Sequence, residues 1–143
     1  MDTHSDTIRA FYADLWDRQD RSGISEILTE DVNFRGSLGA EKTGHDGFWS
    51  YVLDVTGPLG DYRSDIEEIV DDRESAAARM EFSGVHRDTF RGYPATGNRV
   101  SWKGAAFFRF AADGRISRLW VLGDLINLEA SLKENQRRAE DTP

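Results

Sequence analysis

The sequence contains no cysteine. A chain without cysteine forms no disulfide and offers no thiolate for nucleophilic or metal chemistry, so we expect a cytoplasmic protein. Long apolar runs are also missing, because charged residues interrupt every run well short of the roughly 20 residues that a membrane-spanning helix needs. The first residues, MDTHSDTIRAFY, lack the basic and then apolar layout of a signal peptide. We therefore expect no membrane partner.

Basic residues are in the minority. The chain has 18 Lys and Arg residues against 26 Asp and Glu residues, which gives a formal net charge of -8. Its arginines, such as Arg79, Arg87 and Arg91, alternate with acids instead of clustering. Such a surface repels nucleic acid and anionic membranes, because binding to either depends on clustered basic side chains. We expect no nucleic-acid partner, which leaves a small molecule or a protein.

The motifs of common cofactor and metal enzymes are absent as well. There is no GxGxxG after a predicted strand, no phosphate-binding GK[ST] loop and no GxSxG nucleophile turn. The 3 histidines are scattered, without HExxH or a similar zinc spacing. His86 and Asp88 could share one face, but a third metal ligand would have to come from elsewhere. We expect neither a cofactor nor a metal.

What is present begins with helical patterns. Residues 3–20 carry apolar side chains at helical spacing, which predicts one amphipathic helix. A short helix at 25–29, a strand at 31–39 and a third helix at 44–55 follow, and the run TGPLGD ends the last of these. The buried stripe of the first helix comprises Ile8, Phe11, Tyr12, Leu15 and Trp16.

The second half changes to the alternation of strands. β-branched and aromatic residues fill 61–72, 74–90, 98–110 and 114–124, with short turns between them. Adjacent strands with short connections predict an antiparallel sheet. Helical spacing returns after Asp124. The order predicts an α+β fold, in which three N-terminal helices and one C-terminal helix enclose a pocket on a curved antiparallel sheet.

Alternation along each strand also sorts side chains onto two faces. On the last strand, we place Trp120 and Asp124 on the pocket side and Leu119 and Val121 on the outer side. A bulge or a slip in register would reverse this assignment. An apolar wall with a few convergent polar groups is the usual form of a small-ligand site. The pocket is predicted to combine Trp102, Phe108 and Trp120 with the polar side chains of His86, Asp88, Arg118 and Asp124.

Each polar candidate also has a structural explanation. Asp124 directly precedes the last helix, and an N-cap aspartate is worth about 1 kcal/mol. A histidine in a sheet, such as His86, is more often a hydrogen-bonded structural residue than a catalyst. Asp88 and Arg118 can lie in solvent near strand ends. The local pattern alone favours capping for Asp124 and leaves a second role open.

Four motifs in the second half resemble the SnoaL-like polyketide cyclase family, which shares the cone-shaped α+β fold of nuclear transport factor 2. They are G-x-H at 84–86, P-x-T-G at 94–97, aromatic-R-F before a D-G turn at 108–114, and W-x-x-x-D at 120–124. The segments TEDVNFRG (29–36) and GHDGFWSYV (44–52) fit the same layout. The resemblance implies a single domain over 1–132, followed by a charged tail at 133–143.

The resemblance also implies an activity. The family's catalytic members close a polyketide ring by intramolecular aldol condensation without metal or cofactor, and they use an aspartate at the position of Asp124. Asp124 is then the general acid and base, with His86 as a supporting catalytic group. The implied ligand is a hydrophobic polycyclic or polyketide-like molecule. Its binding residues are expected to be Trp120, Trp102, Asp88, Phe108, Arg118, Tyr12, Trp16, Asn33 and Tyr51.

Two positions depart from the family pattern. The strand GAAFFRF is apolar where catalytic members often place a polar or histidine side chain, and Arg118 replaces the usual acid before the tryptophan. Two other functions therefore stay open. One is epoxide hydrolysis or isomerisation, with Asp88 and Asp124 sharing a water, and the other is ligand binding without turnover.

Cone domains of this type usually pair through the outer face of the sheet. By the parity assigned above, Leu119, Val121 and Phe107 lie on that face. The resemblance therefore predicts a homodimer in which these side chains meet.

Overall fold

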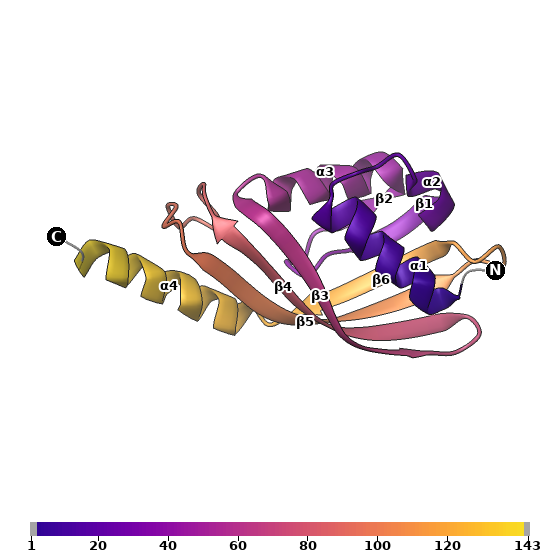
Figure 1. Ribbon diagram of the computed structural model, residues 1–143. Coiled ribbons are helices and arrows are strands. Elements are labelled where there is room, and N and C mark those ends of the chain that lie inside the picture. Colours follow the sequence, from indigo (N-terminus) through magenta and orange to yellow (C-terminus); the bar gives the residue numbers. More distant parts are fainter. Residues whose placement is uncertain (1–2, 142–143) are drawn as a thin grey trace.

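A computed structural model describes residues 3–141. Six strands form one curved sheet in the order β2-β1-β6-β5-β4-β3, and the N-terminal helices cover one of its faces (Figure 1). This architecture confirms the predicted α+β fold. The elements are α1 (His4–Ala10), η1 (Phe11–Asp17), α2 (Ile24–Ile27), β1 (Leu28–Arg35), β2 (Glu41–Thr43), α3 (Gly44–Thr56), β3 (Leu59–Asp71), β4 (Ser75–His86), β5 (Arg99–Phe110), β6 (Ile116–Gly123) and α4 (Leu125–Asp141).

The first helix lies within the predicted range but changes its winding halfway. At its start, the Thr3 hydroxyl accepts the backbone N–H of Asp6 at 3.1 Å, and the Asp6 carboxylate accepts that of Thr3 at 3.2 Å. This reciprocal capping box fixes the start of α1. The second half, η1, is a π-helix, closed by a bond from the Arg18 N–H to the Ala13 carbonyl at 3.0 Å. Hydrophobic periodicity gave no sign of this wider turn.

Aromatic side chains of η1 join the helices to the sheet. The Phe11 ring packs edge-on against Phe108 of β5, with 6.2 Å between centroids, and contacts Phe48 of α3 at 5.4 Å. Trp16 meets Phe48 edge-on at 5.9 Å. Buried aromatic pairs of this geometry stabilise a core beyond the area they bury. The core therefore lies between η1, α3 and the concave face of the sheet.

The sheet is mixed and not wholly antiparallel as predicted. The three pairs β3–β4, β4–β5 and β5–β6 are antiparallel. β1 runs parallel to β6, and the short strand β2, which the sequence did not indicate, pairs with β1 in the antiparallel sense. A parallel pair requires a long crossover, and the elements between β1 and β6 provide it. The consequence is that the N-terminal strand lies beside the last one.

The predicted facing of β6 is wrong. Leu119 and Val121 are 1% and 3% exposed and belong to the core, whereas Trp120 and Leu122 are 41% and 51% exposed. The register explains the inversion, because Leu119 pairs with the buried Phe108 of β5. Directly paired residues share a face of the sheet. The inward facings predicted for His86, Trp102 and Phe108 agree with their burial.

The C-terminal helix α4 projects beyond the end of the sheet (Figure 1). Leu128 and Leu132 are fully buried and hold its first half against the domain. The helix then continues to Asp141, so residues 133–141 of the predicted charged tail are helical. The end of the predicted tail, 142–143, lies outside the described residues. No helix within residues 3–141 is long and apolar enough to cross a membrane.

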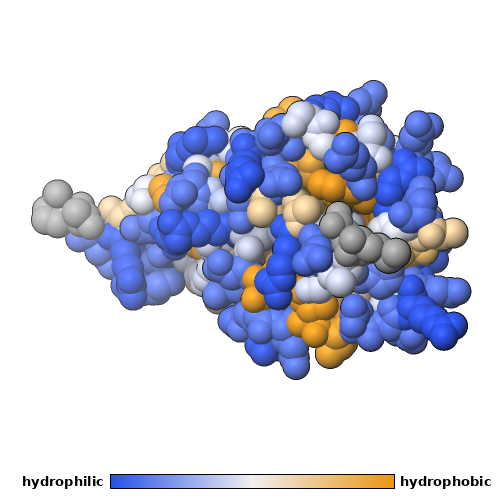
Figure 2. Space-filling view, turned by 45° about the vertical axis from the view of Figure 1, so that its right-hand side comes forward, coloured by the Kyte–Doolittle hydropathy of each residue, from blue (hydrophilic) through white to orange (hydrophobic). Residues whose placement is uncertain are grey.

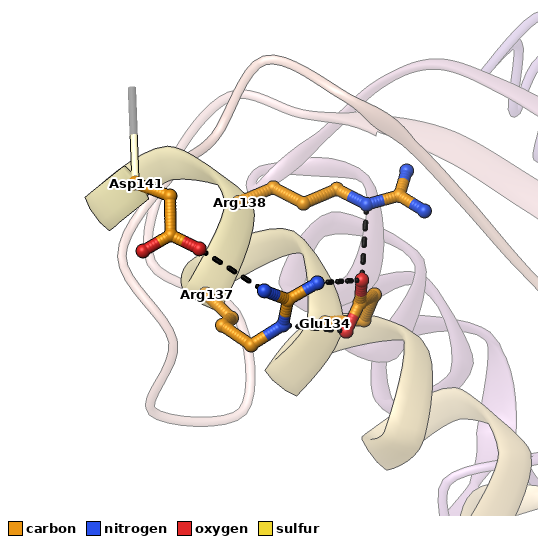
Figure 3. A network of polar contacts seen from close by, with 4 residues as sticks. All are labelled: Glu134, Arg137, Arg138 and Asp141. Atoms are coloured by element: carbon orange, nitrogen blue, oxygen red, sulfur yellow. Dashed lines mark hydrogen bonds and ion pairs between the residues drawn. The ribbon is translucent and has the colours of Figure 1, made fainter. Parts of the chain in front are cut away.

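Ion pairs along one side of α4 support its exposed half. The Glu134 carboxylate accepts hydrogen bonds from Arg137 at 2.6 Å and from Arg138 at 3.0 Å, and Arg137 also contacts Asp141 at 3.0 Å (Figure 3). Pairs three and four residues apart lie side by side on a helix and stabilise it slightly. These contacts account for a helix that extends past its last buried leucine.

Candidate functional site

A small cavity with aromatic walls lies between η1, α3 and the concave face of the sheet. Its free volume is about 10 Å³, which is room for about one water molecule. Tyr12, Trp16 and Tyr51, all predicted to bind the ligand, lie together in its wall. A ring-sized ligand enters only if side chains of the wall move. The complete wall is Phe11, Tyr12, Trp16, Phe34, Ser37, Tyr51, Val55, Tyr62, Phe82 and Val121.

The loop that follows β1 closes one side of this cavity. Gly36 lies so close to the Tyr51 ring that a Cβ atom there would overlap it. The Tyr51 hydroxyl accepts the backbone N–H of Leu38 at 3.2 Å, and the Ser37 hydroxyl accepts the indole N–H of Trp102 at 3.1 Å. These bonds tie the loop to α3 and β5. Trp102, predicted as a ligand-binding residue, thus holds the loop whose Ser37 lines the cavity.

Asp124 stands directly after the strand residue that touches this loop. A Cβ atom on Gly123 would lie 2.7 Å from the Ser37 carbonyl oxygen and 3.3 Å from Trp102 Cδ1. The Oδ1 atom of Asp124 accepts the Asn127 N–H at 3.3 Å, and Oδ2 accepts the Asn127 side-chain amide. Asp124 is therefore the N-cap of α4. A carboxylate has about four acceptor positions, so these two bonds leave it able to bind another donor.

His86 is fully buried at the end of β4. Its Nε2 atom lies 3.0 Å from the Tyr93 carbonyl oxygen. Because a carbonyl only accepts, Nε2 carries the proton and Nδ1 holds an unshared electron pair. Within residues 3–141, Nδ1 is buried without a hydrogen-bond partner. His86 thus presents an acceptor to the interior, but it lies outside the residues that line the cavity.

A second group of predicted site residues lies on the outer face of the sheet. Trp120 is 41% exposed, its ring is 5.8 Å from that of Phe107, and the Arg35 guanidinium stacks over it at 5.2 Å. Asn33 and Arg118 are exposed partners in the β1–β6 register. The prediction that Trp120, Arg118 and Asn33 line one pocket with the inner residues is wrong, because the sheet separates them from the cavity.

Two further candidates have structural roles in this fold. Asp88 is exposed in the turn after β4, where its N–H donates to the Pro58 carbonyl at 3.3 Å and its Oδ1 accepts the Thr89 N–H at 2.8 Å. It does not continue the buried face of β4 as predicted, because the strand ends at His86. Phe108 is buried and supports Tyr12 edge-on from behind the cavity wall, at 6.3 Å.

Asp17, which the sequence analysis did not single out, carries a strongly shifted pKa. Burial raises the pKa of its carboxyl to about 6, even though hydrogen bonding from Ser64 lowers it. The Ser64 backbone N–H donates to Oδ1 at 2.9 Å. In a regular α-helix, residues five apart point about 140° away from each other. The wider turns of the π-helix η1 bring Asp17 back toward the side of Tyr12. The sequence alone gives no sign of these turns, so it could not show that Asp17 lies near Tyr12.

Tyr12 has a buried hydroxyl that no group satisfies. The side chain is 2% exposed, and within residues 3–141 its Oη atom has no hydrogen-bond partner. Burial, together with the negative charge of Asp17, raises the pKa of the phenol far above its usual value. Tyr12 therefore remains a neutral donor at every physiological pH. A buried donor without an acceptor destabilises the folded state.

We expect Tyr12→Phe to stabilise the protein. The substitution removes a hydroxyl that is buried without a partner, so the free energy of unfolding should rise by about 1 kcal/mol. Urea unfolding followed by tryptophan fluorescence measures this change. The control is Tyr51→Phe, which should lower stability by about 1 kcal/mol because the Leu38 N–H loses its acceptor. Equal destabilisation by both substitutions would contradict the assignment.

Asp17 should make stability depend on pH. Its pKa is about 6 in the folded protein against an ordinary value of 3.8, so between these values the folded state binds more protons than the unfolded state. The free energy of unfolding therefore falls as pH rises from about 4 to about 6, and it stays low above that range. In Asp17→Asn, the decrease in the free energy of unfolding between these pH values should be smaller by roughly 1 kcal/mol. This figure allows for the solvent screening of a partly exposed carboxylate.

Urea unfolding of both proteins at pH 4.5 and pH 7.5 tests the dependence on Asp17. Asp14→Asn removes the same charge from the same helix, three residues earlier, and should leave the fall unchanged. An Asp17→Asn protein that lost as much stability with pH as the wild type would show that this carboxyl is not the group responsible.

Comparison with known proteins gives a consistent result. The family model of SnoaL-like polyketide cyclases matches residues 6–132, whereas no curated protein gives a sequence match. The SnoaL-like polyketide cyclase from Agrobacterium tumefaciens strain C58 has a TM-score of 0.76 at 25% identity, covering 92% of this chain and 99% of that chain. IdmH from Streptomyces antibioticus, proposed to be a polyketide cyclase, has a TM-score of 0.78 at 24% identity, with coverage of 92% and 99%.

A further similar structure has a different proposed activity. AclR from Streptomyces galilaeus, proposed to be a hydroxylase, has a TM-score of 0.76 at 22% identity, covering 91% of this chain and 84% of that chain. At such identities structural likeness establishes the fold and leaves the reaction to the site. The family match is stronger, because it spans most of the chain and includes the motifs at 84–86, 94–97 and 120–124. The chain belongs to the SnoaL-like polyketide cyclase family.

Proposed function

We propose that the protein closes a ring in a polyketide-type substrate by intramolecular aldol condensation, with Asp124 as general acid and base and no cofactor. One observation carries this proposal. Gly123 lies against Ser37, a residue of the cavity wall, so Asp124 follows directly after a residue that borders an aromatic cavity. Asp124 is not itself among the residues that line the cavity, so its carboxylate meets the substrate only when the ligand widens the cavity toward the start of α4.

The reaction needs one proton carrier. The Asp124 carboxylate removes a proton from a carbon that lies between two carbonyls of the substrate. The resulting enolate carbon attacks another carbonyl of the same molecule, which forms the new carbon–carbon bond and an alkoxide. Protonated Asp124 then returns its proton to that alkoxide. General acid–base catalysis contributes about 10²- to 10⁴-fold, and holding the reacting carbons together supplies up to about 7–11 kcal/mol.

His86 and Trp102 already use their N–H groups in hydrogen bonds inside the protein, which limits how they can support catalysis. The ring N–H of His86 is directed to the Tyr93 carbonyl, and the indole N–H of Trp102 to Ser37. Neither group can stabilise a developing enolate oxygen without breaking a bond. Because His86 also lies outside the residues that line the cavity, we assign it a supporting role at the end of β4 and not a contact with the substrate. Substrate binding must also widen the cavity, since its free volume is about 10 Å³.

The geometry gives less support to epoxide hydrolysis. That mechanism needs Asp88 and Asp124 around one water, yet Asp88 lies exposed in a turn. The neighbouring Arg87 is also engaged, because its guanidinium donates to the Thr56 and Gly57 carbonyls, each at 2.9 Å. Ligand binding without turnover remains as the second candidate, favoured by the absence of Asp124 from the residues that line the cavity.

Asp124→Asn separates catalysis from capping, since asparagine is as good an N-cap as aspartate. We expect turnover to fall at least about 100-fold, with the free energy of unfolding nearly unchanged. The assay incubates each protein with linear and tricyclic polyketide esters and with small epoxides, and mass spectrometry identifies the products. Asn127→Ala is the matched control, because it removes the side-chain amide that donates to Oδ2 but keeps the backbone cap bond and the carboxylate, and it should retain activity.

Two outcomes would refute the catalytic role of Asp124. In the first, the wild type binds these esters but converts none of them, so the protein is a binding domain. In the second, Asn127→Ala loses as much activity as Asp124→Asn, so the contacts at the start of α4 and not the charge of the carboxylate matter.

We also propose that the protein is a homodimer that pairs through the outer face of the sheet. Of the side chains predicted for this interface, Phe107 is exposed there, but Leu119 and Val121 are buried in the core. The exposed apolar side chains on this face are Val70, Phe107, Trp120 and Leu122. Figure 2 shows a surface that is mostly hydrophilic, with apolar residues gathered in a few places, one of them on its underside.

Charge on this face supports a second copy as the partner. A groove of about 390 Å³ crosses it, with Asp71 and Asp72 among its lining residues together with Arg109 and Arg118. Because a two-fold axis pairs one patch with itself, the acids of one copy can meet the arginines of the other. A face with apolar side chains and both charges is self-complementary in this arrangement.

Trp120→Ala should weaken such a dimer at least about 10-fold, since a large aromatic side chain is a typical hot spot of an interface. Sedimentation equilibrium measures the effect, with a monomer mass of 16.2 kDa. Ile126→Ala removes a more exposed apolar side chain, 84% accessible on α4, and should leave the association unchanged. A wild-type protein that sediments as a monomer at micromolar concentration would rule the dimer out.

A further inference from the structure

The proposed chemistry leaves one buried donor of the cavity unused. Trp102 and His86 have already given their N–H groups to Ser37 and to the Tyr93 carbonyl. Tyr12 lines the cavity, is 2% exposed, and its hydroxyl has no partner within residues 3–141. Natural proteins pair nearly all buried polar groups, so an unpaired one at a ligand site indicates a partner that arrives with the ligand.

The surroundings of Tyr12 define the shape of that partner. Trp16 and Tyr62 lie on the cavity wall with their ring centroids 5.3 Å apart, and Phe82 is 6.3 Å from the ring of Tyr12. Aromatic walls favour a flat apolar molecule, which stacks on them or meets them edge-on. A ligand that places one oxygen at the Tyr12 hydroxyl satisfies both the shape and the unused donor.

Asp17 adds a constraint on the charge of that oxygen. Asp17 stands about one π-type turn after Tyr12 on η1, and its Oδ1 atom is held by the Ser64 backbone N–H at 2.9 Å. Burial is the main cause that raises the pKa of the Tyr12 phenol, and the negative charge of Asp17 adds to it. Arg63 and Asp65 on β3 also act on this carboxyl, with opposite signs. An anion beside Tyr12 would therefore face a fixed negative charge in a poorly solvated place.

We propose that the Tyr12 hydroxyl anchors an uncharged carbonyl or phenol oxygen of a flat aromatic ligand, and that Asp17 excludes the corresponding anion. The inference rests on the proposed function in one respect, which is that the ligand occupies the interior cavity. It adds a specificity rule that the aldol mechanism does not contain. The anchored oxygen is a remote, neutral one, distinct from the enolate oxygen that forms during ring closure.

Three probes with one ring system test the anchor and the charge rule. They are naphthalene, 2-naphthol and 2-naphthoate, which carry no oxygen, a neutral oxygen and an anionic group at neutral pH. Isothermal titration calorimetry at pH 7.5 gives their dissociation constants for the full chain. Tyr12→Phe should bind 2-naphthol about 5- to 10-fold more weakly, the value of one hydrogen bond, and naphthalene as well as the wild type does.

Tyr93→Phe is the matched control for Tyr12→Phe, because it removes a phenol hydroxyl outside the cavity wall. It should bind all three probes like the wild type. If Tyr12→Phe weakened naphthalene and 2-naphthol equally, or weakened neither, Tyr12 would not be the anchor.

Asp17→Asn tests the charge rule. We expect its affinity for 2-naphthoate to rise at least about 5-fold, while its affinity for 2-naphthol stays the same. Asp14→Asn changes the net charge equally on the same helix and should leave the 2-naphthoate affinity unchanged. An equal gain in both variants would show a general charge effect and overturn the role of Asp17.

The outcomes distinguish this inference from the proposed reaction. Failure of all three probes to bind the wild type overturns the inference, whatever the turnover assay shows. Ester turnover that depends on Asp124, together with probe affinities that ignore Tyr12, refutes the anchor and leaves the aldol proposal standing. The expected probe affinities without any ester turnover refute the aldol reaction and support the anchor as part of a binding domain.

Discussion

Phe108 of β5 lies opposite Leu119 of β6, and Phe107 lies opposite Trp120. Because paired residues share a face, this register sends Leu119 and Val121 into the core and leaves Trp120 on the outer face. A slip by one residue would exchange the two sets. The wall of the cavity and the apolar outer surface therefore both depend on one pairing between two strands.

A second constraint is the balance of polar groups in the interior. Ser37 accepts from Trp102 and Tyr51 accepts from Leu38, so the loop beside the cavity is held by satisfied bonds. The hydroxyl of Tyr12 and Nδ1 of His86 are buried without partners in the described part of the chain. Proteins tend to break local rules of stability where function requires it. Of these two groups, only Tyr12 lines the cavity, and a buried donor left unpaired there is the arrangement expected of a site whose ligand supplies a polar atom.

Much of this fold could be predicted from the sequence, because strong periodic patterns mark most of its elements. The stripe from Ile8 to Trp16 placed the first helix, and turn residues such as those of TGPLGD separated α3 from β3. The inward facing of Trp102 and Phe108 was also predicted correctly. The alternate positions of β5 include Lys103 and Arg109, whose charged side chains are costly to bury.

Other features had no usable signal. On β6, the residues of both parities are apolar, Leu119 and Val121 against Trp120 and Leu122, so alternation could not choose between the two faces. Only pairing with β5, a long-range property, decides it. The wide turn of η1 depends on packing against the sheet, and therefore the location of Asp17 was hidden. The cap at Asp124 was visible locally, but the approach of the preceding Gly123 to Ser37 was not.

Gly36 determines where one ring of the cavity wall can lie. The Tyr51 ring occupies the place where a side chain at position 36 would begin, and this ring in turn forms part of the cavity wall. Even alanine there must displace the ring. The room available to a ligand therefore depends on the absence of a side chain at position 36, as well as on the residues that form the wall. A substitution at position 36 therefore changes the shape of the cavity, while every aromatic residue of the wall is retained.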